Sequence, residues 1–255
     1  MQIKIPYTPR KHQAFLHREI SRFRWNVLVC HRRFGKTVCM INHLIRSALL
    51  SKHKNPRFAY IAPTFKQAKS IAWDYMKQFT AKIPHTKFNE TELRVDLPNG
   101  SRITLLGSEN SDGLRGIYLD GCVIDEYANV NDKLFPEIIR PALSDRKGYC
   151  VFIGTPQGMN NNFYELYQHA QGAEDWFNYK AKASETKIVD EEELTKAKDV
   201  MGEKKYLQEF ECDWIANIEG AIYADALADL ENKKHITRVP YDPSLPVSTS
   251  WDLGV

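Results

Sequence analysis

The sequence lacks any apolar run of the ~20 residues that a membrane-spanning helix requires, and its first residues, MQIKIPYTPRK, lack the apolar stretch of a signal peptide. We therefore expect a cytoplasmic protein. Its five cysteines include no C-x-x-C pair, and several lie in apolar runs typical of buried thiols, so neither zinc nor a disulfide framework is indicated. A strong excess of one charge is also missing. The net charge of +3 permits a polyanionic partner without identifying one.

With 255 residues, of which 43% are hydrophobic, the chain can bury one substantial core, which favours one large domain with a small appendage. Local basic clusters are more often solvated faces than phosphate contacts, and they gain weight only beside an independent signal. They are Lys52-His53-Lys54 with Arg57, Arg22 with Arg24, and Lys204 with Lys205.

Short runs rich in β-branched and aromatic residues recur along the first 155 residues, and several precede helical patterns such as Thr37–Ser51 and Lys66–Lys82. Strands that alternate with helices predict an α/β fold with a mainly parallel sheet between helices. The predicted strands are Asn26–Cys30, Phe58–Ala62, Arg102–Leu106, Gly121–Ile124 and Tyr149–Ile153.

Two further regions interrupt this alternation. Leu93–Leu97 and Arg102–Leu106 flank an Asn-Gly step, which predicts a β-hairpin as an insertion or an antiparallel edge. After Thr155-Pro156 the strand signal fades, and Asn162–Gln171 and Asp190–Cys212 have helical periodicity, with Asp190 as a candidate N-cap. We interpret this region as a small helical subdomain. The prolines at 240, 243 and 246 then indicate a linker or an extended entry into another domain.

A phosphate-binding loop is the strongest functional signal. The segment Val27–Thr37 is an apolar strand that leads through Gly35-Lys36-Thr37 into a helix. Backbone N–H groups at such a helix start surround phosphates, Lys36 would reach the β- and γ-phosphates, and Thr37 would ligate Mg²⁺. The usual first glycine is replaced by Cys30, so the motif alone also fits an ordinary strand-to-helix turn.

Two other strand ends carry matching chemistry. Gly121–Glu126 is an apolar strand that ends in two acids, of which Asp125 would hold the Mg²⁺ shell and Glu126 would orient the attacking water. Thr155, after the strand at 150–153, would lie near the γ-phosphate, because ligands gather at the carboxyl ends of parallel strands. Each feature alone has a structural reading, solvated carboxylates in one case and a Gly-Pro turn in the other.

Together these segments resemble the large terminase subunit of tailed bacteriophages, and the resemblance covers nearly the whole chain. A degenerate, arginine-rich phosphate loop without its first glycine is a habit of that family. The segments that carry the resemblance are Thr8-Pro9-Arg10-Lys11-His12-Gln13, Cys30–Thr37, Gly113-Leu114-Arg115-Gly116, Val123-Ile124-Asp125-Glu126-Tyr127 and Gly154-Thr155-Pro156.

The resemblance implies roles for several residues. Gln13 falls in the segment that contacts adenine, Arg32 matches the loop arginine that approaches the γ-phosphate, and Arg33 joins the nucleotide-binding set. Arg115 matches an arginine that can act as a finger in the neighbouring subunit's site, with a surface turn as its structural alternative. We prefer structural roles for His12, His31 and His43.

The same resemblance implies a Mg-dependent ATPase that drives double-stranded DNA into a procapsid in the host cytoplasm, with the portal protein and the small terminase subunit as partners. We expect a homo-oligomeric ring at work and no membrane association; in isolation the chain could be monomeric. The segment at 247–254 resembles the first strand of an RNase H-like nuclease, with Asp252 as one metal ligand. One carboxylate cannot hold a two-metal site, so nuclease activity is not expected from this chain.

These inferences give an expected organisation. It comprises a P-loop ATPase core at 1–165, a helical lid subdomain at 166–216, a linker at 217–246 and a truncated nuclease strand at 247–255. The alternatives are a helicase of the second superfamily or another DNA-dependent P-loop translocase, and a docking module that binds nucleotide without turnover. The helicase would need arginine motifs in a second motor domain, and retention of Lys36, Asp125 and Glu126 argues against the docking module.

Overall fold

The computed structural model describes residues 5–109, 114–215, 230, 233–235 and 244. The chain divides into two compact units, Met1–Asn217 and Ile218–Val255. Among the few described residues of the second unit, the His235 N–H donates to the Leu230 carbonyl at 2.8 Å. Almost all of the predicted linker, and the whole predicted nuclease strand with Asp252, lie outside the described residues.

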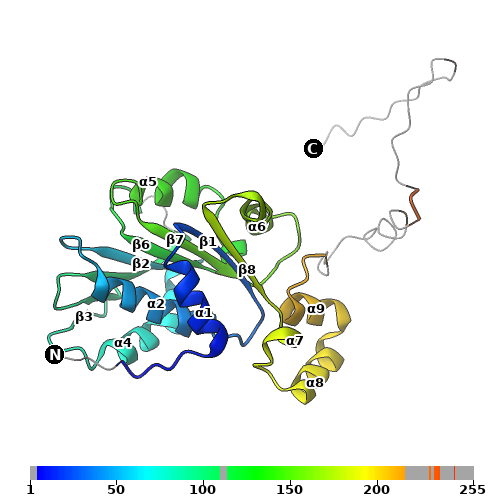
Figure 1. The fold of residues 1–255 in the computed structure, drawn as a ribbon, viewed down its shortest axis with the longest axis horizontal. Coiled ribbons are helices and arrows are strands. Elements are labelled where there is room, and N and C mark those ends of the chain that lie inside the picture. The colour runs from blue at the N-terminus through cyan, green and yellow to red at the C-terminus, as the bar shows by residue number, and fades with distance from the viewer. Residues whose placement is uncertain (1–4, 110–113, 216–229, 231–232, 236–243, 245–255) are drawn as a thin grey trace. The chain divides into compact units, whose positions relative to one another are not determined.

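The first unit is built on one sheet with strand order β3-β4-β5-β2-β6-β7-β1-β8 (Figure 1). In this spatial order, every neighbouring pair from β5 to β8 is parallel. At the other end of the order, β3 with β4 and β4 with β5 pair antiparallel. The predicted α/β class is therefore confirmed. The strands are β1 (Trp25–Cys30), β2 (Arg57–Ala62), β3 (Lys87–Asn89), β4 (Arg94–Asp96), β5 (Arg102–Gly107), β6 (Gly121–Asp125), β7 (Tyr149–Gly154) and β8 (Trp176–Ala181).

Helices cover both faces of this sheet. In Figure 1, α1, α2 and α4 lie on one face and α5 and α6 on the other. In the described residues, no helix is both long and apolar enough to cross a membrane. The helices are α1 (Lys11–Ile20), α2 (Lys36–Leu50), α3 (Phe65–Ala68), α4 (Asp74–Thr80), α5 (Arg140–Ala142), α6 (Asn162–Gly172), α7 (Ala183–Thr186), α8 (Glu191–Met201) and α9 (Glu203–Glu211).

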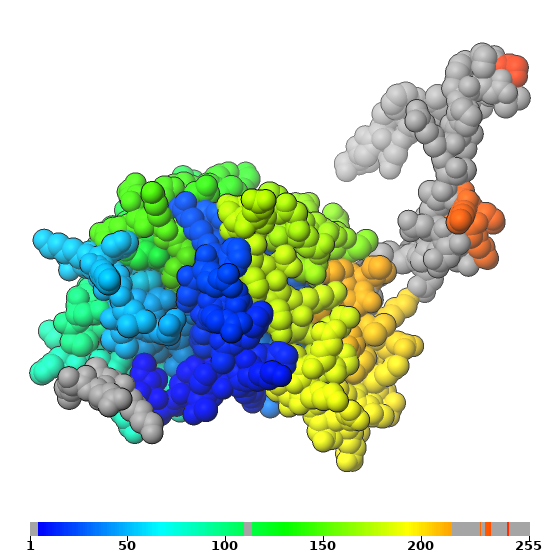
Figure 2. Space-filling view, in the orientation of Figure 1, coloured from blue at the N-terminus to red at the C-terminus, as the bar shows by residue number. Residues whose placement is uncertain are grey.

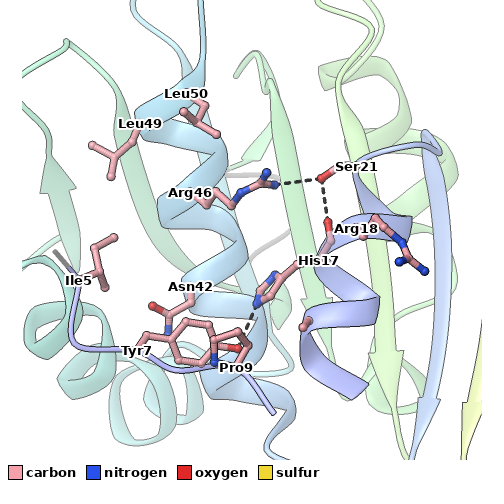
Figure 3. Close-up of a pocket in the computed structure, with 11 residues that line it drawn as sticks. Ile5, Tyr7, Pro9, His17, Arg18, Ser21, Asn42, Arg46, Leu49 and Leu50 are labelled. Carbon is pink, nitrogen blue, oxygen red and sulfur yellow. Dashed lines mark hydrogen bonds between the residues drawn. The ribbon is translucent and has the colours of Figure 1, made fainter. Parts of the chain in front are cut away.

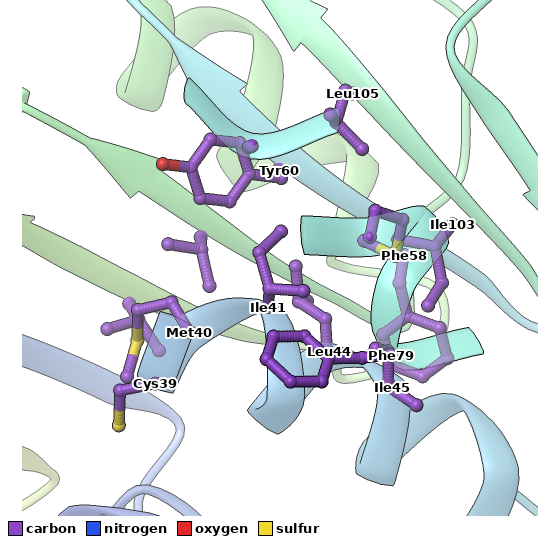
Figure 4. Packing of buried hydrophobic residues seen from close by; sticks show 14 of the residues in the cluster. Cys39, Met40, Ile41, Leu44, Ile45, Phe58, Tyr60, Phe79, Ile103 and Leu105 are labelled. Atoms are coloured by element: carbon purple, nitrogen blue, oxygen red, sulfur yellow. The ribbon is translucent and has the colours of Figure 1, made fainter. Parts of the chain in front are cut away.

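Alternation along β1 divides the core into two layers. Leu28 and Cys30 belong to the layer under α1, α2 and α4, while Val27 and Val29 belong to the layer under α5 and α6, because successive strand residues point to opposite faces. In the first layer, apolar residues of α2 at helical spacing pack against β2, β5 and α4 (Figure 4). This packing fixes α2 directly behind the loop that follows β1. The space-filling view in Figure 2 shows α1, in blue, across the same face.

The predicted hairpin is present as the antiparallel edge. Residues Leu97 and Gly100 close the turn through the Gly100 N–H, which donates to the Leu97 carbonyl at 3.0 Å. Gly100 has a φ of 83°, a left-handed angle that glycine adopts without steric cost. The five predicted strands are also confirmed, each within a residue or two of its expected bounds.

Two local expectations were wrong. The sequence shows no strand signal within the predicted helical subdomain at 166–216, but β8 lies there and pairs in parallel with β1. The predicted helix at 190–212 is two helices, because Gly202 adopts φ 79° and ψ 159°, which breaks the helix. The predicted helix at 66–82 is present as a continuous helical run from Phe65 to Thr80, in which a π-helical segment, Lys69–Trp73, separates α3 from α4. Asp190 does cap α8, since its side chain accepts from the Glu192 N–H.

Candidate functional site

The loop between β1 and α2 has the backbone of a phosphate cradle. Gly35, which immediately precedes α2, has a φ of 88°, and Arg33 is also left-handed at 72°. A Cβ at Gly35 would lie 2.9 Å from the Gln13 amide nitrogen, so a side chain there would be both strained and crowded. The buried Phe34 anchors the middle of the loop in the core. The N–H groups at the start of α2 are thereby held at the carboxyl edge of the sheet.

Lys36, which begins α2 after the loop from β1, contacts the residues that follow two other strands. Its Nζ lies 2.9 Å from the Thr155 Oγ1, which follows β7, and 3.1 Å from the Glu126 Oε1, which follows β6. Burial of the ammonium acts to lower the pKa of Lys36, but the carboxylates of Glu126 and Asp125 outweigh it, so the pKa lies above its usual value. Lys36 is therefore a largely buried cation that keeps its charge.

Asp125 occupies the last position of β6 and is buried. The Tyr60 hydroxyl, from the neighbouring β2, donates a short hydrogen bond to the Asp125 Oδ2. Burial, reinforced by the adjacent Glu126, raises the pKa of Asp125 to about 6, while Lys36 and the Tyr60 bond act to lower it. At neutral pH the carboxylate is ionised and available to a cation.

Glu126 has a left-handed backbone, with φ 46° and ψ 49°. A non-glycine residue rarely adopts this conformation, and such residues concentrate at functional sites. The turn directs the Glu126 carboxylate to Lys36 rather than along the strand. Two consecutive acids at the end of β6 are thereby separated into different surroundings, one against Tyr60 and one against Lys36.

A pocket of about 690 Å³ opens over Lys36, Glu126 and Thr155. Its lining comes from the phosphate loop, from Glu126 and Thr155, from Ile71 and Tyr75 after β2, and from Glu209 on α9. Thr37 and Asp125 supply the hydroxyl and carboxylate oxygens that Mg²⁺ favours. In the described residues no three His, Cys, Asp or Glu side chains cluster as a complete metal cage. This donor set suits a Mg²⁺ that shares its coordination with substrate phosphates.

Helix α9 closes one side of the phosphate loop. The Arg32 N–H donates to the Glu209 carbonyl at 2.7 Å, and the Arg32 guanidinium lies 3.8 Å from the Glu209 carboxylate. The adjacent Gln208 is buried and donates to the Pro156 carbonyl at 2.6 Å. The helical segment is thus joined to both the loop after β1 and the turn after β7.

The comparisons with known proteins show the family of this chain. A family model described as terminase large subunit, T4likevirus-type, N-terminal, matches residues 29–227, which is more than half of the chain. The chain belongs to the terminase large subunit family. The matched interval includes the phosphate loop, the two acids after β6 and the turn after β7.

Relatives within the terminase family are distant. The chain is 27% identical over 180 residues to the large terminase subunits of Thermus phage G20c and Thermus virus P23-45. These alignments cover 63% of the chain and 36% of each relative, so it spans about a third of their length.

Solved structures of terminases share the fold. The large terminase ATPase domain of Thermus phage P74-26 has a TM-score of 0.70 at 22% identity, with 82% of this chain and 95% of that one covered. The large terminase of a second thermophilic bacteriophage has a TM-score of 0.69 at 14% identity, with 81% and 54% covered.

The remaining terminase-derived candidates lie apart from the lysine and the acids. Gln13 is buried in α1, where its amide nitrogen donates to the Gly35 carbonyl at 3.3 Å and its oxygen accepts from the Arg10 N–H. Arg115 lies at the surface, 3.7 Å from the Glu137 carboxylate, and does not line the 690 Å³ pocket. Gln13 therefore supports the loop, whereas Arg115 lies outside this chain's own pocket.

Sequence reasoning missed Tyr60, Gln208 and Glu209. Tyr60 sits in a run of apolar strand residues and carries no local signal of its partner, which is 65 positions away. Gln208 and Glu209 lie in a helix whose contact with the phosphate loop depends on the whole fold. Of the three histidines given structural roles, His31 is buried and bonds to Thr186 at 2.8 Å.

A second cavity, of about 610 Å³, lies between the N-terminal segment, α1 and the second half of α2 (Figure 3). Apolar side chains such as Ile5 and Leu49 form much of its wall, and it includes no residue of the phosphate loop. Tyr7 and His17 are hydrogen bonded there at 3.0 Å. Because the Lys36 ammonium and the acids lie elsewhere, we assign the chemistry to the 690 Å³ pocket.

Proposed function

We propose that this chain is the ATP-hydrolysing motor part of a large terminase subunit, which drives double-stranded DNA into a procapsid. The observation that carries the proposal is the meeting of Lys36, Glu126 and Thr155 at one edge of the sheet, with Asp125 beside them. Structures of the second thermophilic phage's large terminase in complex with ADP and with ATP-gamma-S support nucleotide as the ligand.

The phosphates would take over the contacts of Lys36. In the structure its ammonium contacts the Thr155 hydroxyl and the Glu126 carboxylate. A triphosphate carries more charge than either group, so it would draw Lys36 to the β- and γ-phosphates. Glu126 would then be released at the moment the substrate arrives.

Thr37 and Asp125 would hold Mg²⁺, with Tyr60 orienting the Asp125 carboxylate. When bound, Mg²⁺ supplies positive charge that neutralises the β- and γ-phosphate oxygens. Because the pKa of Asp125 is raised only to about 6, this ligand is ionised at neutral pH. Both residues belong to this chain, so the proposed metal site needs no partner subunit.

Glu126, once released from Lys36, would orient the attacking water and accept its proton. Its left-handed backbone sets the carboxylate on the pocket side of β6, and it lines the pocket together with Thr155. Thr155 would respond when the γ-phosphate is lost, because its hydroxyl contacts Lys36, the residue proposed to bind that phosphate. The division of labour between Asp125 and Glu126 follows from their different partners.

Arg32 and Arg33 would add positive charge from within the loop, and Arg115 from a neighbouring subunit. Glu209 now holds Arg32, so movement of Arg32 to the γ-phosphate would break a contact with α9. We infer that α7, α8 and α9 form the lid that responds to the nucleotide. Gln13, which supports Gly35, would set the adenine end of the site.

The wider assignment follows from the family. We propose the portal protein and the small terminase subunit as partners, a homo-oligomeric ring at work and the host cytoplasm as its location. The domain bounds at 165, 216 and 246 remain predictions, as does Asp252 as one metal ligand of a nuclease site. ATPase activity is the expected behaviour of this chain.

A steady-state ATPase assay tests the proposal. Wild type should hydrolyse ATP only with a divalent metal, and Glu126→Gln should retain ATP binding while its turnover falls by about 10²–10⁴-fold, since the water-orienting group is lost. Glu92→Gln, an exposed acid elsewhere on the unit, is the charge-matched control. Binding without turnover by wild type would favour a nucleotide-dependent docking module, and near-normal turnover by Glu126→Gln would place the base elsewhere.

A further inference from the structure

At the other end of the parallel strands, where they begin, lies a separate pocket of about 490 Å³. We call this end of the sheet the amino edge, and the end next to the phosphate loop the carboxyl edge. It is lined by Phe58 and Tyr149 at the starts of β2 and β7, and by Asp120, which precedes β6. The strands that lead from this edge to the phosphate loop are six residues long, so the two pockets lie roughly 20 Å apart. A ligand here would not compete for space with a nucleotide.

Positive charge dominates this amino-edge pocket. Five arginine or lysine side chains line it, against one carboxylate, that of Asp120. Both oxygens of Asp120 are already occupied: Oδ2 accepts from the Arg57 N–H at 2.7 Å, and Oδ1 contacts His53 closely and Arg146 at 3.7 Å. The five cations are Arg22, Arg24, Arg46, Arg146 and Lys147.

Neutral groups hold three of these cations in place, and one of the three, Arg146, also lies 3.7 Å from the Asp120 carboxylate. Arg24 donates to the carbonyls of Gly148 and Leu143 at 3.0 and 3.1 Å and stacks on Trp25 at 4.6 Å. Such contacts fix a guanidinium without neutralising it, so its charge remains available to an external anion.

Arg146 and Arg46 are held in the same manner. Arg146 donates to the Lys54 carbonyl at 3.2 Å and stacks on Tyr118 at 4.5 Å. Arg46, on the last turns of α2, donates to the Ser21 hydroxyl at 3.2 Å (Figure 3). Two arginines are thus positioned from different elements toward one opening.

Lys147 completes the set. It is exposed, has a left-handed backbone with φ 51°, and within the described part of the chain has no hydrogen bond or ion pair to an acid. The exposed Lys52 and Lys54 extend the positive band along the loop before β2. Glu19, the nearby acid of α1, is bridged to Arg18 and Arg22 and compensates only that end.

The charge pattern distinguishes between possible partners. Protein–protein interfaces are depleted of charge at their centre and depend on apolar or aromatic anchors, whereas protein–DNA interfaces are polar and strongly positive. Here the centre of the pocket is charged, and its cations continue onto the surrounding surface. A band of this extent exceeds a single phosphate and fits a row of them.

We propose that the amino edge of the sheet binds the backbone phosphates of double-stranded DNA, with Arg46 and Lys147 as direct contacts. The choice of DNA as the polyanion rests on the proposed motor function, while the site itself does not. Such contacts position a duplex and carry no sequence preference. Affinity should therefore depend strongly on salt and little on sequence.

Fluorescence anisotropy of a labelled blunt duplex, without nucleotide, tests this surface in the whole chain. The double variant Arg46→Gln with Lys147→Gln should bind about ten- to a hundred-fold more weakly, and the slope of log affinity against log salt should fall by about two. Lys187→Gln with Lys196→Gln is the matched control, because Lys187 is also exposed and left-handed, with φ 51°, and Lys196 is an exposed helical cation. Thermal melts should be equal for both pairs.

Competition separates the sources of negative charge. Unlabelled duplex should displace the probe, while inorganic phosphate at the same ionic strength should not. Displacement by free phosphate would make this a small-anion site, and stronger displacement by polyglutamate than by duplex would make it a site for acidic protein; either result overturns the proposal. Equal weakening by both variant pairs would also overturn it.

The ATPase assay keeps this proposal separate from the motor function. Wild-type ATPase activity without duplex binding would reject the surface and leave the motor function standing. Duplex binding that the amino-edge variants abolish, in a chain without ATPase activity, would support the surface and reject the motor.

Discussion

Helix α2 connects two edges of the sheet that treat charge in opposite ways. At its first residue, Lys36 is largely buried and contacts Glu126 and Thr155. Toward its end, Arg46 is exposed and bonded to a neutral hydroxyl, in a pocket with five cations and one acid. At the carboxyl edge the cation is paired with a carboxylate, whereas at the amino edge the cations outnumber the acids.

The difference indicates what each edge requires from a ligand. At the carboxyl edge, a ligand must displace existing partners, which makes binding selective for a strongly charged, compact group that fits the loop. At the amino edge, cations are held open, so any extended polyanion gains affinity through the release of counterions. The first arrangement suits catalysis on a bound nucleotide, and the second suits binding of a long polyanion.

The largest expected effect separates the two edges directly. Lys36→Ala should abolish ATP binding and leave duplex binding within about two-fold of wild type, since only the phosphate loop loses its cation. Lys147→Ala should do the reverse, with normal ATP affinity and weaker duplex binding. Titrations with a fluorescent ATP analogue and with labelled duplex measure both. Unchanged ATP affinity in Lys36→Ala would remove the phosphate-loop assignment.

Arg115 tests whether the carboxyl edge is complete within one chain. It lies outside the nucleotide pocket and pairs with Glu137, so a catalytic role requires a neighbouring subunit. Arginine fingers contribute about 10³–10⁵ in rate, so Arg115→Ala should lower ATP turnover on that scale and spare ATP binding. Specific activity of the wild type should rise with protein concentration as neighbours meet, and Arg115→Ala should remove that rise.

Mixing defective subunits makes the test sharper. Arg115→Ala and Glu126→Gln each lack a different half of a shared site, so one intact composite site can form at a mixed interface. Partial activity should return on mixing. An inactive mixture whose subunits are nevertheless cross-linked would show that Arg115 does not act in trans, and a surface or within-subunit role would replace the finger.

The sequence predicted the groups whose chemistry is local. Gly35-Lys36-Thr37 and Asp125-Glu126 are recognisable as consecutive residues at strand ends, and the parallel sheet brings them together. The partners that tune them could not be predicted, because Tyr60 and Glu209 reach the site only through long-range packing.

The errors in the fold have the same origin. The edge strand β8 pairs only with β1 and is partly exposed along most of its length, so it shows no continuous apolar run. Gly202 lies within a helical apolar period, and a glycine costs a helix only about 1 kcal/mol, so the break is decided by tertiary packing. The sequence favours solvated faces for the basic clusters, because only the fold brings Arg22, Arg24 and His53 together around one pocket.

The Tyr60 hydroxyl provides a smaller test of the carboxyl edge against the amino edge. Tyr60→Phe removes the donor to Asp125 and leaves a buried carboxylate oxygen without it, which costs about 1–3 kcal/mol. We expect the Mg²⁺ concentration for half-maximal ATPase activity to rise roughly ten-fold, with recovery at high Mg²⁺. Tyr149→Phe is the matched control, because this tyrosine starts β7 at the amino edge and donates to Ser47 at 3.0 Å. Equal effects of the two variants would indicate a general loss of packing.

The smallest expected effect concerns His17 and His43, which lie between the two edges with stacked rings 5.5 Å apart and Nδ1 atoms at 3.2 Å. Burial, with the nearby Arg46, lowers the pKa of His17 to about 4, and burial, with His17 and Arg46, lowers that of His43 to about 3. Both are neutral in the folded chain at pH 7. Below about pH 6.5 the unfolded chain takes up protons that the folded chain does not, so stability falls as the pH drops toward 4.

Each histidine should contribute a slope of up to about 1.4 kcal/mol per pH unit in that window. Asp125, with its pKa raised to about 6, acts in the opposite direction because its folded form binds the proton more tightly, so the wild-type slope alone does not isolate the histidines. Urea unfolding at several pH values should therefore compare His43→Gln with His85→Asn, a change at an exposed, left-handed position. The first variant should lose part of the slope between pH 6.5 and 4, while the second keeps it. Equal slopes in both would mean that the pair is protonated in the fold, and that α2 carries an uncompensated charge along its length as well as at its amino-edge end.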